Sequence, residues 1–336
     1  MEEDLTLKKA RFILADSVQV PEGASPPVRI SNSTAGPGAG SSSIVISFNG
    51  MRVKKGISTA ESPFKMSDDF DKVTVDGKDF LDVKVESVCY HCPDQAFFNL
   101  DERCMYHCIY CASPLLDHNK AKSLTAERMA DMIRANGHVK AIAITSGVYE
   151  SVQSTIDRMV ECVRYLHNEF PELPIGVEPY VDDHEQIDAL KDAGATEIKI
   201  NCEAARKDIF MKVCPELDQD NIIDMLTYAV KIFGKGKVAS NIIVGLGESD
   251  DDVISLVKRL AELGITAGLR PLKLNGFVKE QFIEKMGDIA PNTPERLVDL
   301  AKKQKSIFEN YGLSPKTFDT MCFRCTCCDI VPFIDL

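Results

Sequence analysis

From about residue 95 onward, short apolar segments alternate with longer amphipathic ones, and this alternation limits the possible folds most strongly. The short segments predict strands at residues 96–101, 140–146, 173–179, 196–203, 237–248 and 265–274. The longer ones predict helices at 124–137, 151–170, 184–194, 251–264 and 294–312, with further helices between 203 and 233. Thr125 suits the N-cap of the first of these helices and Gly137 its end. Strands that alternate with helices form parallel sheets, so we expect an α/β fold, a partial (β/α)6 barrel.

Three closely spaced cysteines, Cys104, Cys108 and Cys111, follow the first predicted strand in the run RCMYHCIYCASP. Tyr110 stands directly before the last of them. Three thiolates can hold three corners of a cubane [4Fe–4S] cluster, whereas a structural zinc site or a fully liganded cluster needs four. The fourth iron would then be free to bind a small molecule. The alternative, buried thiols packed as small hydrophobic residues, suits isolated cysteines but not three within eight residues.

This spacing with its aromatic residue resembles the signature of the radical S-adenosylmethionine (SAM) superfamily. The resemblance implies that Cys104, Cys108 and Cys111 ligate a [4Fe–4S] cluster whose open iron binds the amine and carboxylate of SAM. It implies reductive cleavage of SAM to a 5′-deoxyadenosyl radical. It also implies a TIM-type barrel with the cysteine loop after the first strand, which is where the predicted strand order puts it.

Polar residues stand where the predicted strands end, at Ser146-Gly147, Glu178, Asn201 and Glu203. In the superfamily a Gly-rich turn after the second strand presents backbone groups to the SAM ammonium. Ser146-Gly147 departs from its usual GGE form. Asn201 and Glu203 resemble the ribose- and methionine-contacting positions of biotin and lipoyl synthases, and a carboxylate near the SAM amine can accept a charge-assisted hydrogen bond. Solvated loop residues are the alternative.

The fifth predicted strand carries the run SNIIVGLGES, with Asn241, Gly245 and Gly247. It resembles the G-x-I-x-G-x-x-E element of the superfamily, and its GLGE tetrad is shared with biotin and lipoyl synthases. Glycines let a flat adenine approach the backbone, which a side chain would block. Arg270 on the sixth strand is expected at the same mouth, facing the SAM carboxylate or a substrate acid.

Six further cysteines lie in two groups, Cys89 and Cys92 before the first barrel strand and Cys322, Cys325, Cys327 and Cys328 in the run MCFRCTCCDIVPF. Two from each group would make a four-thiolate site, which we expect to hold an auxiliary [4Fe–4S] cluster at one rim of the barrel. A structural zinc ion, or a metal bound by the last four alone, is the alternative. Cys162, Cys202 and Cys214 stand alone and are expected to be ordinary buried thiols.

The region before the barrel lacks its periodicity. Residues 31–43 are rich in Gly, Ser, Pro and Ala and predict a loop, flexible or substrate-covering. Hairpins are predicted at Asn49-Gly50 and Asp76-Gly77. The chain therefore divides into a β-rich extension at 1–92, the barrel at 93–290, and a helix with a cysteine-rich tail at 291–336.

Within the superfamily the chain resembles biotin and lipoyl synthases most. It lacks the C-x4-C-x5-C run and RSSY end of bacterial lipoyl synthase and resembles instead the archaeal-type enzyme, a pair of biotin-synthase-like proteins. This resemblance implies sulfur insertion at C6 or C8 of an octanoyl chain on a protein lysine, with the auxiliary cluster as sulfur donor. The implied partners are an octanoylated lipoyl-domain protein or peptide, a second radical SAM protein, and a reductant such as ferredoxin or flavodoxin.

Composition narrows the remaining possibilities. The formal charge of −12 argues against a nucleic-acid-binding surface. No apolar run reaches the roughly 18 residues of a membrane span, and no signal peptide is evident, so we expect a cytoplasmic protein without disulfides. Two other functions stay open. One is a different radical SAM enzyme, a methyltransferase, mutase or peptide-modifying enzyme whose auxiliary cluster survives turnover, and the other is a non-catalytic iron–sulfur or zinc scaffold.

Overall fold

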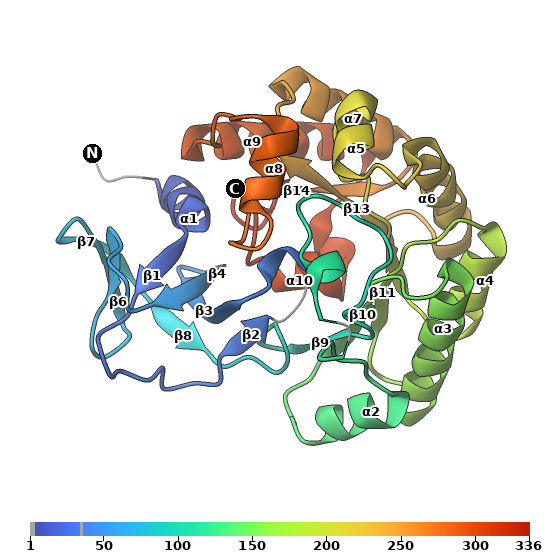
Figure 1. The fold of residues 1–336 in the computed structure, drawn as a ribbon, viewed down its shortest axis with the longest axis horizontal. Coiled ribbons are helices and arrows are strands. Elements are labelled where there is room, and N and C mark those ends of the chain that lie inside the picture. The colour runs from blue at the N-terminus through green and yellow to red at the C-terminus, as the bar shows by residue number, and fades with distance from the viewer. Residues whose placement is uncertain (1–3, 34–35, 118) are drawn as a thin grey trace.

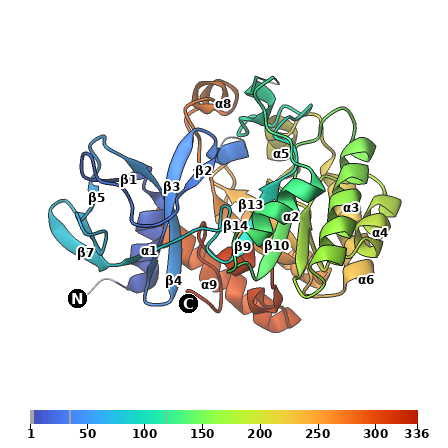
Figure 2. The ribbon, with the colours of Figure 1, turned by 90° about the horizontal axis from the view of Figure 1, so that it is seen from below.

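The computed structural model describes residues 4–33, 36–117 and 119–336. Two parts lie side by side, an open barrel of parallel strands wrapped by helices and a mostly antiparallel sheet whose strands fall between Ser17 and Glu86 (Figures 1 and 2). None of the helices in these ranges is long and apolar enough to cross a membrane.

The barrel sheet has six parallel strands in chain order, and its first and last strands pair with no other described strand on their outer edges. Its strands are β9 (Gln95–Asn99), β10 (Ala141–Thr145), β11 (Ile175–Glu178), β12 (Glu197–Lys199), β13 (Val238–Val244) and β14 (Thr266–Pro271). The predicted partial (β/α)6 barrel is therefore confirmed. Because all six strands run in one direction, the loops after them meet at one mouth.

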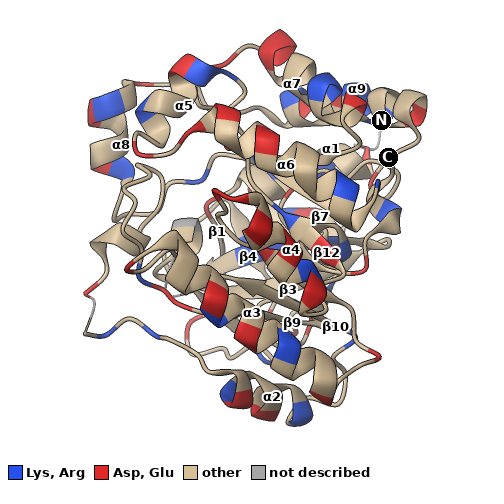
Figure 3. Ribbon diagram, turned by 90° about the vertical axis from the view of Figure 1, so that its right-hand side faces the viewer, with Lys and Arg blue, Asp and Glu red and all other residues tan. Residues whose placement is uncertain are grey.

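The helices of this part of the chain lie mostly on the outside of the sheet and carry residues of both charge signs (Figure 3). They are α2 (Ala126–Arg134), α3 (Val152–Glu169), α4 (His184–Asp192), α5 (Lys207–Val213), α6 (Gln219–Phe233), α7 (Asp250–Glu262), α8 (Lys279–Met286) and α9 (Pro294–Tyr311). Most begin at an Asp, Ser or Thr whose side chain accepts a backbone N–H, including the predicted N-cap Thr125. Gly137 does not end α2, which stops at Arg134 with Ala135 as its C-cap.

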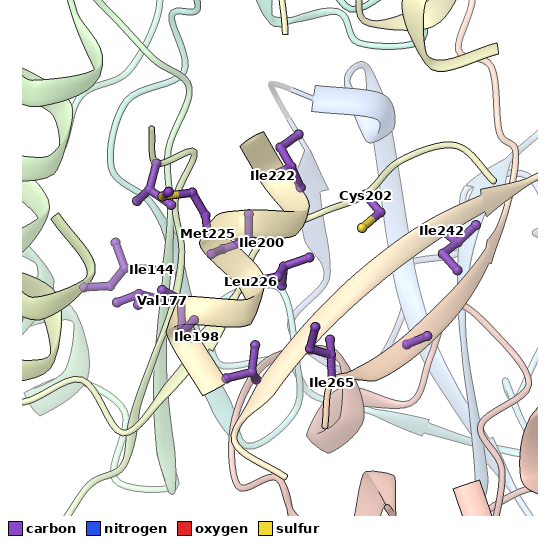
Figure 4. Packing of buried hydrophobic residues seen from close by; sticks show 14 of the residues in the cluster. Ile144, Val177, Ile198, Ile200, Cys202, Ile222, Met225, Leu226, Ile242 and Ile265 are labelled. Carbon is purple, nitrogen blue, oxygen red and sulfur yellow. The ribbon is translucent and has the colours of Figure 1, made fainter. Parts of the chain in front are cut away.

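Strand residues alternate between the helical layer and the barrel interior. Val177 and Ile198 point outward and pack with Met225 and Leu226 of α6 (Figure 4). Their neighbours Gly176, Glu178, Glu197 and Lys199 therefore face inward. The interior is thus lined by small and charged side chains rather than by an apolar core.

The sheet before the barrel has eight strands and one helix that the sequence did not predict, α1 (Leu5–Leu14). Its strands are β1 (Ser17–Gln19), β2 (Ser31–Ser33), β3 (Ser41–Phe48), β4 (Met51–Ser58), β5 (Phe64–Met66), β6 (Lys72–Val75), β7 (Lys78–Asp82) and β8 (Lys84–Glu86). Both predicted hairpins are confirmed, since Asn49 and Asp76 take positive φ before their glycines. The loop prediction for 31–43 is wrong in part, because Ser31–Ser33 pairs with Ser41–Ser43; residues 34 and 35 lie outside the described ranges.

The last segment of the chain returns to the barrel. After α9 come the 3-10 turn η3 (Pro315–Thr317) and the short helix α10 (Met321–Cys325), which lies at the centre of the barrel in Figure 1. Beyond it, Asp335 forms a fully buried ion pair of 2.6 Å with Lys9 of α1. Lys9 also donates to the carbonyl of Thr326 at 2.8 Å, so α1 clasps the end of the tail.

Candidate active site

The loop between β9 and α2 carries Cys104, Cys108 and Cys111 at the mouth of the barrel, all partly exposed. Two backbone bonds fix this cysteine loop. The Met105 N–H donates to Val148 O at 2.7 Å, and the Ile109 N–H donates to Val213 O at 3.0 Å. The loop that follows β10 and the C-terminal end of α5 therefore hold the cysteine loop in place.

The three thiols lie close enough to influence one another. Burial raises the pKa of Cys104, with Cys108 adding to the rise, and burial raises the pKa of Cys111 to about 11, with Cys108 and Cys104 adding. No three His, Cys, Asp or Glu side chains in the described part of the chain converge as they would on a single metal ion. In a cubane each thiolate binds a different iron, so ligands need not converge on one point.

Asp101, which the sequence analysis did not single out, anchors the start of this loop. Its side chain is 1% exposed and binds Arg103 at 2.7 and 2.9 Å and Arg158 at 2.9 Å. Burial alone would raise the pKa of Asp101, but hydrogen bonds from the two arginines lower it from 3.8 to about 2. Arg103 in turn stacks on Tyr149, with its guanidinium carbon 3.7 Å from the ring centre. A single buried carboxylate therefore joins β9, the cysteine loop and α3.

Gly147 touches the cysteine loop directly. A Cβ at this position would lie 2.2 Å from the carbonyl oxygen of Arg103 and 3.2 Å from Cβ of Cys104. Its N–H donates to Asp101 O at 2.8 Å, and Ser146 Oγ donates to Gly147 O at 2.7 Å. The lack of a side chain at Gly147 lets the two loops approach each other.

A chain of polar side chains runs inside the barrel from the mouth downward. Burial raises the pKa of Glu203 from 4.5 to about 7, although its polar neighbours Tyr110 and Asn201 act to lower it. Asn201 Nδ2 donates to Glu178 Oε1 at 2.9 Å, and Glu178 pairs with Lys199 at 2.8 Å. Glu203 is held at positive φ, a strained conformation that bonds to β13 on both sides maintain.

The GLGE turn after β13 binds its own glutamate. Glu248 accepts the N–H groups of Gly245 and Leu246, both at 2.7 Å, and Arg296 pairs with it at 3.0 Å. Gly245 and Gly247 both have positive φ, near 100°. A Cβ on Gly247 would meet only Ile289, at 3.8 Å, so a planar ring has access to the backbone there.

One acceptor at the mouth is unused. Asn99, the last residue of β9, has a buried Oδ1 without a hydrogen-bond partner in the described structure. It lies where the cysteine loop begins, so it fits a donor such as a hydroxyl or amine of SAM. Its position at a strand end was the sequence signal that could have identified it.

Asn241 and Arg270 bind other polar groups of the barrel and the tail. The Asn241 N–H donates to Asn201 Oδ1 at 3.2 Å, and Arg270 Nε donates to Asn241 Oδ1 at 3.4 Å. Arg270 also pairs with Asp329 of the tail at 3.0 Å. In this structure Arg270 therefore binds the tail inside the barrel.

The structure brings Cys92 together with Cys325 and Cys327, which come from the opposite end of the chain. Hydrogen bonds from Cys327 and Cys92 lower the pKa of the Cys325 thiol. Cys328 packs against this group, beside Val45 of β3. Cys89 points away, with its thiol 2.9 Å from Pro93 O, so the N-terminal pair contributes one member.

The fourth tail cysteine, Cys322, lies inside the barrel. Lys199 Nζ donates to its sulfur at 3.0 Å. Burial acts to lower the pKa of Lys199, but Cys322 and Glu178 raise it above its ordinary value. The three isolated cysteines, Cys162, Cys202 and Cys214, are all buried as expected, and Cys214 also contacts the Tyr110 hydroxyl at 3.5 Å.

Basic side chains surround the thiol group formed by Cys92, Cys325, Cys327 and Cys328. The backbone N–H of Lys54 donates to Cys327 O at 3.1 Å. The Lys54 ammonium, with the charges of Lys273 and Arg270, acts electrostatically on Cys328. Burial lowers the pKa of Lys273, which shows the cost of placing this cation here. An anionic iron–sulfur group bound by these thiolates would offset that cost, so the residues fit such a group.

Known proteins are similar to this chain in sequence and in fold. A biotin synthase of Desulforudis audaxviator is 28% identical over 171 residues, 49% of this chain and 51% of that protein. A lipoyl synthase of Photobacterium profundum is 26% identical over 204 residues, 54% of this chain and 61% of that one. The chain thus spans between half and two thirds of the length of these relatives. The crystal structure of the FeFe-hydrogenase maturase HydG from Carboxydothermus hydrogenoformans shares the fold, with a TM-score of 0.53, 16% identity, and coverage of 65% of this chain and 52% of that one.

Residues 99–260 match the family described as the radical SAM superfamily. The matched region begins at the last residue of β9 and runs through the cysteine loop to α7. The family prediction made from the cysteine spacing is confirmed: this chain carries a radical SAM domain, similar to those of biotin synthase and lipoyl synthase.

Proposed function

We propose that this protein is a radical SAM sulfur-insertion enzyme, a lipoyl synthase component that adds sulfur at C6 or C8 of a protein-bound octanoyl-lysine. The similarity to a biotin synthase and a lipoyl synthase supports this class of reaction. The observation that carries it within this chain is the second thiol group, because sulfur insertion needs a sulfur source beside the SAM cluster. Cys92, Cys325, Cys327 and Cys328 are the proposed ligands of that auxiliary [4Fe–4S] cluster.

Each part of the site has a role under this proposal. Cys104, Cys108 and Cys111 hold the first cluster, which when bound supplies the electron for cleavage of SAM. Asn99 and Glu203 accept hydrogen bonds from SAM, and Gly247 leaves room for its adenine. The space beside Gly245 is filled by the side chain of Asn292, whose Nδ2 would lie 2.6 Å from a Cβ there. The barrel walls exclude water from the reacting groups and fix their separation.

The proposed partners must reach the mouth. An octanoylated lipoyl-domain protein or peptide, a second radical SAM protein, and a reductant such as ferredoxin or flavodoxin are the partners we propose. Met105, Met211 and Phe277 are 47%, 57% and 63% exposed in the loops and helices that follow β9, β12 and β14. Large apolar side chains exposed around one opening support protein docking there.

The test compares two cysteines of the same C-x2-C pair in anaerobically reconstituted protein. Cys92→Ala should lower the iron content from about eight to about four per chain and abolish sulfur insertion, while 5′-deoxyadenosine still forms. Cys89→Ala is the matched control and should retain both clusters and product, since its thiol points to Pro93. Cys104→Ala should abolish 5′-deoxyadenosine formation. Wild-type protein that cleaves SAM but retains its full sulfide after turnover, without thiolated product, would refute sulfur insertion.

A further inference from the structure

The segment from Asp319 to Asp329, here called the floor segment, closes the end of the barrel opposite the mouth. Its first contacts are with the opening residues of the barrel strands. Glu197, the first residue of β12 and fully buried, accepts the N–H groups of Asp319 at 2.8 Å and Thr320 at 3.0 Å, and also the Thr320 hydroxyl. Gln95, the first residue of β9, bonds to both the N–H and the carbonyl of Met321.

Gly176 of β11 makes room for this contact. A Cβ on Gly176 would lie 2.1 Å from Thr320 Oγ1, 2.8 Å from Thr320 Cβ and 3.0 Å from Cγ of Met321. Any side chain at this position would therefore displace the floor segment. Three strands, β9, β11 and β12, thus fix the backbone at residues 319–321.

The same segment places the cysteines. Two residues after Thr320, Cys322 meets Lys199 inside the barrel at 3.0 Å. Further on, Cys325 and Cys327 meet Cys92, and Asp329 pairs with Arg270 of β14. Because the thiols follow Thr320 within a short span, the depth at which Thr320 binds sets their position relative to the cysteine loop at the mouth.

We propose that Thr320, with its acceptor Glu197 and its neighbour Gly176, is a positioning residue that sets the separation between the two iron–sulfur sites. The proposal rests on the sulfur-insertion function above. A radical made at the mouth must meet sulfur before it is quenched, so a misplaced floor segment should leave SAM cleavage intact and reduce its coupling to product.

The first test compares Thr320→Val with Thr317→Val in the full chain. Thr317 lies in the same tail but bonds outside the barrel, to Gly236 O and Ser314 O. Loss of the buried Thr320 bond to a carboxylate should speed amide hydrogen exchange at residues 319–321 about tenfold, whereas Thr317→Val should change it by less than about threefold. Thr320→Val should also raise the ratio of 5′-deoxyadenosine to inserted sulfur, with iron content unchanged.

The second variant is Gly176→Ala, with Gly137→Ala as control because a Cβ on Gly137 meets nothing within 4 Å. Gly176→Ala should speed amide hydrogen exchange at residues 319–321 more than Thr320→Val does. It should also raise the ratio of 5′-deoxyadenosine to inserted sulfur further. The proposal would be overturned if Thr320→Val and Gly176→Ala changed neither the hydrogen exchange nor the ratio of 5′-deoxyadenosine to inserted sulfur. It would also be overturned if exchange became faster while that ratio stayed the same. If wild-type protein inserts no sulfur, the proposed function fails, and hydrogen exchange then reports separately whether Thr320 holds the floor segment.

Discussion

The buried carboxylate of Asp101 gives the sharpest quantitative test of how the cysteine loop is held. Asp101→Asn removes the charge that Arg103 and Arg158 share but keeps the size of the side chain. The arginines lower the pKa of Asp101 from 3.8 to about 2, which corresponds to about 2 kcal/mol of stabilisation of the ionised folded state. We expect the variant to lose about that much free energy of unfolding at pH 7.

The pH dependence of this loss has a definite sign. Because the folded-state pKa of Asp101 lies below its unfolded-state value, its contribution is present above pH 3.8 and is lost as the pH falls towards 2. The test is urea unfolding of anaerobic protein before cluster reconstitution, at pH 7 and at the lowest pH where the fold persists. The difference in free energy of unfolding between wild type and Asp101→Asn should be smaller at the lower pH. Reconstituted Asp101→Asn should also retain less iron in the cysteine loop.

The chain contains a matched control. Asp208 forms the same two-residue bidentate pair with Arg206, at 2.9 Å for both bonds, but on the exposed start of α5. Exposed ion pairs contribute little, so Asp208→Asn should leave the unfolding midpoint nearly unchanged. Equal effects of the two variants, or an Asp101→Asn effect that does not diminish with acid, would refute the reasoning.

Two further predictions concern the mouth. Gly147→Ala should reduce SAM cleavage about a hundredfold, because its Cβ would displace Arg103 O by more than an ångström; an assay of 5′-deoxyadenosine in which it matches Gly137→Ala would contradict this. Burial raises the pKa of Glu203 to about 7, so ionising Glu203 costs the folded state stability as the pH rises from 4.5 through 7. If ionised Glu203 binds SAM, equilibrium binding should weaken about fivefold from pH 7 to pH 6 beyond any change seen in Glu203→Gln, because the ionised fraction falls from about a half to about a tenth. Identical pH profiles for the two proteins would remove Glu203 from the SAM site.

The sequence was sufficient where the signal is local. The strand–helix alternation predicted the barrel because inward and outward positions differ in composition along each strand, as at Gly176, Val177 and Glu178. The C-x3-C-x2-C spacing identified the cysteine loop because its three cysteines lie within eight residues of one another. The sequence motif identified the glycines of the GLGE turn, whereas the hydrogen bonds from this turn to Glu248 are evident only in the structure.

Contacts between distant segments could not be predicted. The six remaining cysteines suggested two ligands from each group, but only the folded chain distinguishes Cys92, beside Cys325, from Cys89, beside Pro93. The pairing of Arg270 with Asp329 of the returning tail likewise has no local signal in the sequence, and the expected contact of Arg270 with SAM stays a prediction. Such pairings depend on where the tail docks, and no local periodicity encodes that.

The clasp between α1 and the tail bears on the order in which the protein matures. Lys9 binds Asp335, and Cys92 meets Cys325. The two residues of each pair are more than 200 positions apart in the sequence, so neither contact can form until the ribosome has made the end of the chain. The cysteine loop, by contrast, draws on neighbours that precede residue 220. We therefore expect the loop of Cys104 to be able to take up iron on the nascent chain, and the second thiol group only after synthesis is finished.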